Sequence, residues 1–334
     1  MIVTQALDVV LLLLLVMTAV AIARVKDLFA TVMLSGIYGL LSASFFVLMD
    51  AVDVAFTEAS VGAGIFPLLM LAVLSFVGRY EADSKRRVAL PVFLLTLVSG
   101  AVLLLATTQM PAFGGEDTPA QQHVAVRYIE DSPQEIGIPN MVTSVLASYR
   151  GFDTLGEVLV IFTATIGVVV VLLGVVQPGK ARSLPADEDM ADHKVLRIVG
   201  KMLIPLILLF ALYVQFHGDY GPGGGFQAGV IFATGIILYA MLFGLSNAQR
   251  VLPMPLLRGL TALGVMIYGS VGVAGLLAGG NFLDYSVLAS DPVSGQHLGI
   301  LLIELGVGVT VASSMVLIFY AFSLTTSSDG SVER

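Results

Sequence analysis

The sequence predicts an all-α fold, a polytopic bundle of about nine helices that cross a membrane. The chain has 334 residues, of which 57% are hydrophobic and 12% charged, whereas a soluble domain carries about 25% charged residues. The apolar residues form blocks of about 20, long enough to cross a hydrocarbon core of about 30 Å as helices. Because a backbone in lipid must satisfy its own hydrogen bonds, these blocks favour helices over isolated strands. The predicted spans are residues 7–23, 28–49, 58–77, 88–107, 154–176, 200–216, 227–245, 256–278 and 298–322.

The basic residues predict the orientation of these spans. Fourteen of the sixteen Lys and Arg residues lie on alternate connections, and only Arg127 and Arg150 lie on the other side. The positive-inside rule then places the N-terminus outside the cell and the C-terminus in the cytoplasm. An odd number of spans agrees with this. The first span has no basic leader, so we expect it to be retained rather than cleaved as a signal peptide.

Two polar linkers divide the sequence. Residues 108–140 are rich in Gly and Pro and are predicted outside, and residues 177–196 are charged and predicted to be a cytoplasmic linker. We therefore expect four parts, with bounds 1–107, 108–176, 177–196 and 197–334. Residues 140–150 are too short to span, so they lie along the outer interface or pack into the bundle. The sequence has no cysteine, which excludes disulfides and thiolate metal sites in this chain.

The third span begins with two carboxyl groups and continues with two glycines and a proline. If the helix starts near Asp53, Glu58 lies roughly 8 Å into it. Gly62, Gly64 and Pro67 favour a kink or a π-bulge, which would free backbone groups for water or ions. We predict a role in ion translocation for Glu58, since an ionisable group at depth is costly. The alternative is that Glu58 reaches the outer interface and the glycines permit close helix packing. For Asp53 an interfacial position is the favoured interpretation.

Two further carboxyl groups lie in later spans. Thr154 followed three residues later by Glu157 matches a capping box, so Glu157 is either a capping residue or a transport residue. Glu304 is surrounded by apolar residues, and lies about 9 Å into a helix that starts near residue 298. We expect its side chain to face the bundle and to take part in ion translocation. The alternative for Glu304 is a single interhelical hydrogen bond.

A glycine-rich stretch at 217–229, HGDYGPGGGFQAG, separates two apolar spans. His217 can exchange a proton near neutral pH, and its alternative role is a helix cap. The residues Pro222, Gly223, Gly224 and Gly225 predict a sharp turn with exposed backbone groups, which would let a helix end approach an ion or a neighbouring protein. No strand precedes the turn, so it is not a nucleotide-binding fingerprint.

These motifs resemble those of a known family. Residues 200–322 resemble MrpB, also called MnhB, of the Mrp-type multisubunit cation/proton antiporters. The residues that carry this resemblance are His217, Gly218, Pro222, Gly223, Gly224, Gly225, Phe226, Gly229 and the sequence IELGVGVTV around Glu304. Residues 7–77 resemble a small MbhD-like domain near the C-terminus of MrpA, which occurs as separate small subunits in membrane-bound hydrogenases. Its marks are Asp53, Ala55, Glu58, Gly62 and Gly64. Residues 140–176 resemble the MbhE-like segment that follows that domain.

The resemblance implies a membrane subunit of an Mrp-type Na⁺/H⁺ antiporter in which the tail of MrpA has moved onto MrpB. It implies partners among the other antiporter subunits, contact with membrane lipid, and Na⁺ and H⁺ as transported ions. We expect no enzymatic active site, no metal site, no cofactor and no nucleic-acid partner. The expected location is the plasma membrane of a bacterial or archaeal cell. The alternatives are an ion-translocating subunit of a redox-driven, hydrogenase-like complex, and a non-conducting scaffold.

The predicted orientation can be tested with reporter fusions. A reporter enzyme that is active only in the cytoplasm should give a signal when it is fused after Arg334. The same reporter placed in the 108–140 loop should be silent, because the basic residues predict that loop on the outer side. A silent C-terminal fusion together with an active loop fusion would reverse the assignment.

Overall fold

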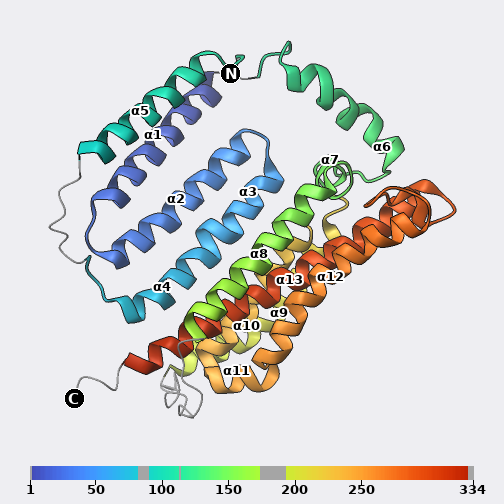
Figure 1. The fold of residues 1–334 in the computed structure, drawn as a ribbon. Coiled ribbons are helices and arrows are strands. Elements are labelled where there is room, and N and C mark those ends of the chain that lie inside the picture. The colour runs from blue at the N-terminus through green and yellow to red at the C-terminus, as the bar shows by residue number, and fades with distance from the viewer. Residues whose placement is uncertain (1, 82–89, 113, 174–192, 330–334) are drawn as a thin grey trace.

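A computed structural model describes residues 2–81, 90–112, 114–173 and 193–329. Within these ranges every named element is a helix, and nine helices are long and apolar enough to cross a membrane, which confirms the predicted fold class and number of spans (Figure 1). Residues 177–192 of the predicted cytoplasmic linker lie outside the described residues. The same holds for Lys85, Arg86, Arg87, Lys180, Arg182 and Arg334, so the orientation in the membrane stays a prediction.

The first half of the chain contains four spans and a set of short helices. Its elements are α1 (Ile2–Arg24), α2 (Leu28–Leu48), α3 (Val52–Glu58), η1 (Ala59–Ile65), α4 (Phe66–Val77), α5 (Leu90–Thr108), η2 (Gln121–Ala125), η3 (Arg127–Asp131), α6 (Ser132–Glu135), α7 (Met141–Thr143) and η4 (Ser144–Tyr149). The second half contains the other five spans. Its elements are α8 (Gly151–Leu173), α9 (Lys194–His217), α10 (Gly225–Phe243), α11 (Leu245–Val251), α12 (Met254–Leu277), η6 (Ser286–Leu288) and α13 (Pro292–Asp329).

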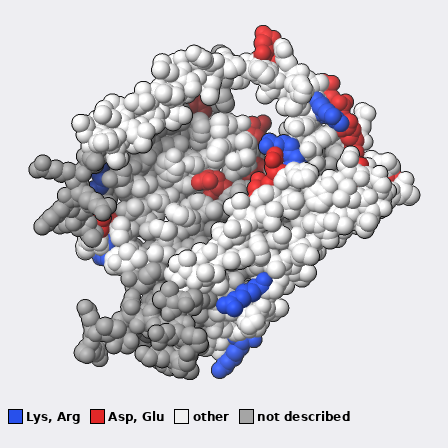
Figure 2. All heavy atoms as spheres, in the orientation of Figure 1, with Lys and Arg blue, Asp and Glu red and all other residues white. Residues whose placement is uncertain are grey.

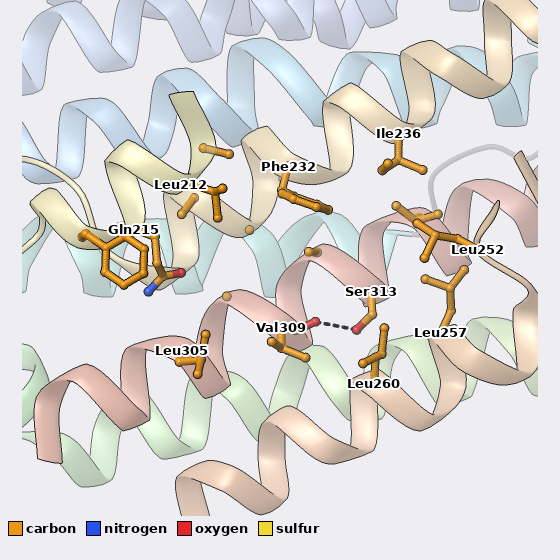
Figure 3. Close-up of a pocket in the computed structure, with 17 residues that line it drawn as sticks. Leu212, Gln215, Phe232, Ile236, Leu252, Leu257, Leu260, Leu305, Val309 and Ser313 are labelled. Carbon is orange, nitrogen blue, oxygen red and sulfur yellow. Dashed lines mark hydrogen bonds between the residues drawn. The ribbon is translucent and has the colours of Figure 1, made fainter. Parts of the chain in front are cut away.

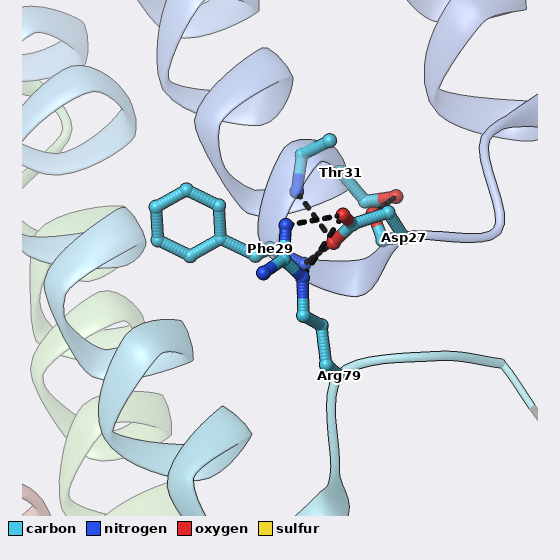
Figure 4. A network of polar contacts seen from close by, with 5 residues as sticks. Asp27, Phe29, Thr31 and Arg79 are labelled. Carbon is cyan, nitrogen blue, oxygen red and sulfur yellow. Dashed lines mark hydrogen bonds and ion pairs between the residues drawn. The ribbon is translucent and has the colours of Figure 1, made fainter.

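A polar clasp joins the start of α2 to the end of α4 (Figure 4). Asp27 is the N-cap of α2, and its Oδ1 accepts the backbone N–H groups of Phe29 and Ala30 at 3.0 and 3.3 Å. The Arg79 guanidinium donates to Asp27 Oδ2 from Nε at 3.1 Å and from Nη2 at 2.9 Å. These bonds from Arg79 lower the pKa of the Asp27 carboxyl. The clasp therefore closes the α2–α4 hairpin at its polar end.

The third span is one helix interrupted by a π-turn, which confirms the predicted bulge. Helices α3 and α4 flank η1, a π-helix that contains Gly62 and Gly64. Pro67 follows directly in the first turn of α4 and has no backbone N–H to donate to the preceding turn. The glycines also permit close packing, because the backbone of Gly62 lies directly against Gly39 of α2. The bulge and the close packing therefore occur at the same motif, and the role of Glu58 stays a prediction.

The buried core lies in the second half of the chain, around α13. This helix is packed against α8, α10 and α12, and it is the most buried of the candidate spans. Three tyrosines in this core are almost completely buried, and two of them donate to backbone carbonyls: Tyr268 to Gly151 at 2.8 Å and Tyr285 to Ala147 at 3.0 Å. By contrast, α5 has no buried residue. Its apolar side chains are exposed in this chain.

Two predicted helix starts, those of the helices that contain Glu157 and Glu304, are wrong. Helix α8 begins at Gly151 rather than near residue 154, and α13 begins at Pro292 rather than near residue 298. Glu304 therefore lies about 18 Å from the start of its helix instead of about 9 Å. Of the two alternatives for residues 140–150, packing into the bundle is the observed one, since Thr143 and Ser144 are buried.

The close approach of α2 and η1 generates a stability prediction. A Cβ added at Gly39 would lie 2.8 Å from the backbone oxygen of Gly62 and 2.8 Å from the nitrogen of Ala63. Gly39→Val should therefore lower the free energy of unfolding by about 1–3 kcal/mol, the usual cost of overpacking. Thermal unfolding of the purified protein measures the effect. Gly100→Val in α5 is the matched control, because nothing lies within 4 Å of a Cβ at that position. Equal melting temperatures for the two variants would contradict the packing argument.

Candidate functional site

A cavity of about 510 Å³ with a mainly apolar wall and several polar groups lies where α3, α7, η4, α8, α10 and α13 meet, and we call it the central cavity. Its polar and backbone lining consists of Asp53, Thr57, Thr143, Thr154, Glu157, Gly223, Gly224, Gly225, Gln227 and Glu304. Glu157 and Glu304, for which a transport role is among the predictions, are thus brought to one cavity with the glycine turn. Asp53, for which the sequence favoured an interfacial position, lines the same cavity. Figure 2 shows acidic and basic side chains gathered in the middle of one face, while the helix flanks there are almost free of charge.

The glycine turn places backbone groups directly against Glu304. Gly224 has a φ of +112°, a conformation that side chains with a Cβ rarely adopt. A Cβ at Gly224 would lie 3.0 Å from Glu304 Oε1, and one at Gly218 would lie 3.1 Å from Oε2. The backbone of Gly225 lies close to the Glu304 carboxylate and interacts favourably with its charge. Gly225 is the first residue of α10, so the carboxylate also meets the positive end of that helix dipole.

The central cavity is bridged by hydrogen bonds between segments far apart in the sequence. Gln227 of α10 donates through Nε2 to Thr57 Oγ1 of α3 at 2.7 Å. Thr143 Oγ1 donates to the carbonyl of Gly218 at 2.6 Å. These bonds hold the bulged third span, the short α7 helix and the glycine turn in one arrangement. Sequence reasoning missed Thr57, Thr143 and Gln227, because nothing local marks them.

Asp219 is a further residue that sequence reasoning missed, although it lies inside the glycine motif. It carries a carboxyl group. Its Oδ2 lies 3.9 Å from Nδ1 of His297, and its side chain is 26% exposed. Burial raises the pKa of Asp219, and the nearby His297 opposes that rise. Asp219 also interacts electrostatically with Glu304, as Asp53 does. The acidic groups therefore continue from the central cavity toward the connection between α9 and α10.

The capping-box interpretation of Glu157 is wrong. Helix α8 begins at Gly151, so Thr154 lies inside the helix and is not its N-cap. The Thr154 hydroxyl donates instead to the carbonyl of Leu146 at 2.8 Å. An ion pair between Arg150 and Asp153 at 2.6 Å marks the start of the helix. Glu157 therefore lies about one turn further into α8 than the glutamate of a capping box would. It lines the central cavity.

Glu58 and His217 are not among the residues that line the central cavity. The Glu58 carboxylate lies against Gly62 in the π-turn, on the side of α3 that faces α2. His217 ends α9, as the sequence predicts, and its ring stacks on Tyr213 with centroids 4.9 Å apart. It lines a separate cavity of about 560 Å³ between α2, α3 and α9, together with Pro222.

A third cavity, of about 340 Å³, lies among α9, α10, α12 and α13 and is almost wholly apolar (Figure 3). Its lining includes Leu212, Phe232 and Leu260, with the Gln215 amide at one end. Gly229 also lines it, and a Cβ there would lie 2.8 Å from the carbonyl oxygen of Gly308 on α13. Gly229 therefore serves the close packing of α10 on α13.

Three family models match the chain. The model described as a domain related to the MnhB subunit of Na⁺/H⁺ antiporters matches residues 195–317. The MbhD and MbhE models, which describe two subunits of MBH, match residues 13–79 and 91–188. Together the matches account for most of the chain, and the glycine motif and Glu304 lie in the first of them.

Two relatives with similar sequences are antiporter subunits by name. A Rhizobium meliloti protein, named as a probable K⁺/H⁺ antiporter subunit of the combined A/B type, is 27% identical over 324 residues, which is 88% of this chain and 32% of that protein. A Staphylococcus aureus protein named "Putative antiporter subunit mnhB2" is 34% identical over 131 residues, which is 36% of this chain and 92% of that protein. The chain thus spans about a third of the first relative and most of the second.

Two solved structures have similar folds. A chain of the Mrp complex from Dietzia sp. DQ12-45-1b matches with a TM-score of 0.73 at 25% identity, over 94% of this chain and 34% of that one. A chain of the membrane-bound sulfane sulfur reductase, an archaeal respiratory membrane complex, matches with a TM-score of 0.53 at 29% identity, over 69% of this chain and 95% of that one.

The fold and the central cavity define a multi-pass helical membrane protein whose carboxyl groups meet a glycine turn between two spans. The chain belongs to the MnhB family of antiporter subunits, and it carries in addition the regions similar to MbhD and MbhE.

The glycine turn generates a prediction that separates backbone strain from contact with Glu304. Gly224 and Gly279 both have positive φ, but only Gly224 has Glu304 beside its Cβ position. Gly279→Ala should cost about 1–2 kcal/mol from the left-handed backbone alone. Gly224→Ala should cost more and should reduce co-purification with other subunits, because the added methyl also displaces the carboxylate. The measurements are melting temperature and subunit co-purification. If Gly224→Ala behaves no worse than Gly279→Ala, the contact with Glu304 is unimportant.

Proposed function

We propose that the chain is a membrane subunit of an Mrp-type antiporter complex and that its central cavity carries part of the path for H⁺ or a monovalent cation. The observation that carries the proposal is the convergence of Asp53, Glu157 and Glu304 on one cavity beside the glycine turn. Ionisable groups at membrane depth are costly and mark ion paths. A carboxyl group can bind either a proton or Na⁺, so both ions can use the same groups.

Glu58 and His217 have distinct positions in this proposal. Glu58 lies on the α2 side of the π-turn, and His217 lies on the far side of α3 in its own cavity. We assign Glu58 to a branch that reaches the central cavity through the bulged backbone, whose π-turn leaves carbonyl groups without regular helical partners. His217 is assigned to proton exchange at the end of α9, where imidazole can change charge near neutral pH.

In this proposal, other subunits of the complex supply the parts of the antiporter that lie outside this chain. The antiporter relatives are named as subunits, and this chain spans about a third of the A/B-type relative. We propose that other antiporter subunits and lipid cover the exposed apolar surfaces of α1 and α5, in the plasma membrane of a bacterial or archaeal cell. Na⁺ is the proposed cation, and K⁺ is the alternative suggested by the printed name of the A/B-type relative.

A second candidate function is ion translocation in a redox-driven complex. The similarity to a chain of the archaeal sulfane sulfur reductase, of which this chain covers 95%, favours it. Purification of the intact complex separates the two candidates. Large antiporter-like chains without iron–sulfur proteins support the antiporter, whereas co-purified iron–sulfur subunits support the redox-driven complex.

The central cavity generates a transport prediction. The Glu304→Gln complex should assemble but lose about tenfold or more of its cation/proton exchange, because an amide keeps the shape of the side chain and cannot carry a proton. The assay is collapse of an imposed pH gradient in proteoliposomes on addition of Na⁺ or, separately, K⁺. Glu130→Gln, a change of the same type at an exposed outer residue, should exchange normally.

Two companion variants sharpen that test. Glu304→Leu removes all polar function, so a leucine variant with normal exchange would support a scaffold without a conducting role. Glu58→Gln should lower exchange without preventing assembly. Normal exchange in that variant would remove the proposed branch and leave Glu58 as an interfacial residue.

A further inference from the structure

A fourth cavity, smaller than the central cavity, adjoins it on the side of the 108–150 segment, and we call it the vestibule. It has a volume of about 350 Å³ and is lined by residues 50–54, 139–142 and 220–222. Three residues, Asp53, Val54 and Val142, line both cavities. They form a shared wall, and Asp53 is the one carboxylate among these three.

The side chain of Asn140 holds this wall in place. Its Nδ2 lies 3.3 Å from Asp53 Oδ1, 3.1 Å from the carbonyl oxygen of Gly218 and 3.0 Å from that of Gly221. A carboxamide NH₂ has two protons for these three acceptors. The Asn140 amide therefore divides its two protons among the Asp53 carboxylate and the two carbonyls.

Asn140 also connects the three parts of the chain that match different families. Asp53 lies in the region similar to MbhD, Asn140 in the region similar to MbhE, and Gly218 and Gly221 in the MnhB region. Its own Oδ1 accepts the backbone N–H of Val142 at 3.0 Å and caps α7. Its backbone N–H donates to the carbonyl of Asp219 at 3.0 Å. Donation to Asp53 and capping of α7 are therefore separate functions of one side chain.

We propose that Asn140 is a positioning residue that holds the Asp53 carboxylate at the wall between the vestibule and the central cavity and so controls access to Glu304. A cation or proton that binds Asp53 competes with the Asn140 amide, which then keeps its bonds to the Gly218 and Gly221 carbonyls. Asp53 is thereby released toward the central cavity with its charge compensated. The claim that ions pass this wall rests on the proposed function. The test measures accessibility of the cavity and does not require transport.

The absence of cysteine from the sequence makes single-cysteine reporters possible. Val307→Cys reports on the central cavity, which Val307 lines as a buried side chain. Tyr220→Cys reports on the vestibule, which Tyr220 lines as an exposed one. Each is placed in the intact complex in vesicles and treated with a cationic, membrane-impermeant methanethiosulfonate. The side from which Tyr220→Cys reacts defines the side of the vestibule.

The expected result is a faster reaction of Val307→Cys when the amide is removed. Asn140→Ala should raise that rate by about tenfold, the factor for loss of one hydrogen bond to a charged group, and should leave the rate at Tyr220→Cys unchanged. Asn140→Asp keeps an acceptor for the Val142 N–H but removes the donor, so it should raise the rate as well. If Asn140→Asp restores the slow reaction, only the helix cap matters and the proposal fails.

Asp53→Ala supplies an independent arm if the Asn140 variants do not assemble. It should raise the Val307→Cys rate by a similar factor, and the double variant with Asn140→Ala should be no faster than either single variant, because both remove the same contact. An unchanged rate in Asp53→Ala, or additive effects in the double variant, would overturn the proposal. A complex that labels as expected but exchanges no cation would refute the transport function alone. A complex that exchanges cations with unaffected labelling would refute the role of Asn140 alone.

Discussion

The structure depends on the placement of one carboxylate, that of Glu304, against the backbone of a glycine turn. A carboxyl group at this depth is costly in lipid, and its cost is reduced by the nearby backbone of Gly225 and the N-terminus of α10. Only residues without a Cβ can bring the backbone this close, and the φ of +112° at Gly224 excludes most side chains. The apolar spans on both sides of the turn, α9 and α10, are arranged so that this contact can form.

The central cavity is a junction of three regions rather than a property of one. The third span contributes Asp53 and Thr57, α8 contributes Glu157, and α10 and α13 contribute the glycine turn and Glu304. In the S. aureus relative, of which this chain covers 92% with only 36% of its own length, the MnhB region occurs without the rest. Fusion of the regions in one chain fixes their stoichiometry and gives the cavity walls a common backbone.

Much of the fold could be predicted from the sequence, because the signals that define it are local. Blocks of apolar residues located the nine spans, and the combination of Gly62, Gly64 and Pro67 located the π-turn. The start of α13 was missed because Ser294, Gln296 and His297 are polar and suggest a loop. The structure supports them by tertiary contacts, such as the bond between Ser148 and Gln296 at 2.7 Å. Thr154 failed as a cap for a related reason, since the preceding short helix lets α8 begin three residues earlier.

The site could be predicted only in its parts. Glu304 and the glycine turn are conspicuous because of what surrounds them in the sequence. Their convergence with Asp53 and Glu157 depends on how the regions pack, and no local pattern encodes it. The bond between Asn140 and Asp53 joins residues 87 positions apart. An asparagine before a short helical segment reads as an N-cap and nothing more.

The length of α13 has a consequence for how the protein meets its bilayer. With 38 residues it is about 57 Å long, nearly twice the thickness of a hydrocarbon core of about 30 Å. It is also the most buried of the candidate spans, because it packs against α8, α10 and α12. The candidate spans in α1 and α5 have 21 and 19 residues, close to the number needed to cross the hydrocarbon core, and no residue in them is buried. Hydrophobic mismatch therefore acts on these peripheral helices, and a thicker or thinner membrane tilts them first.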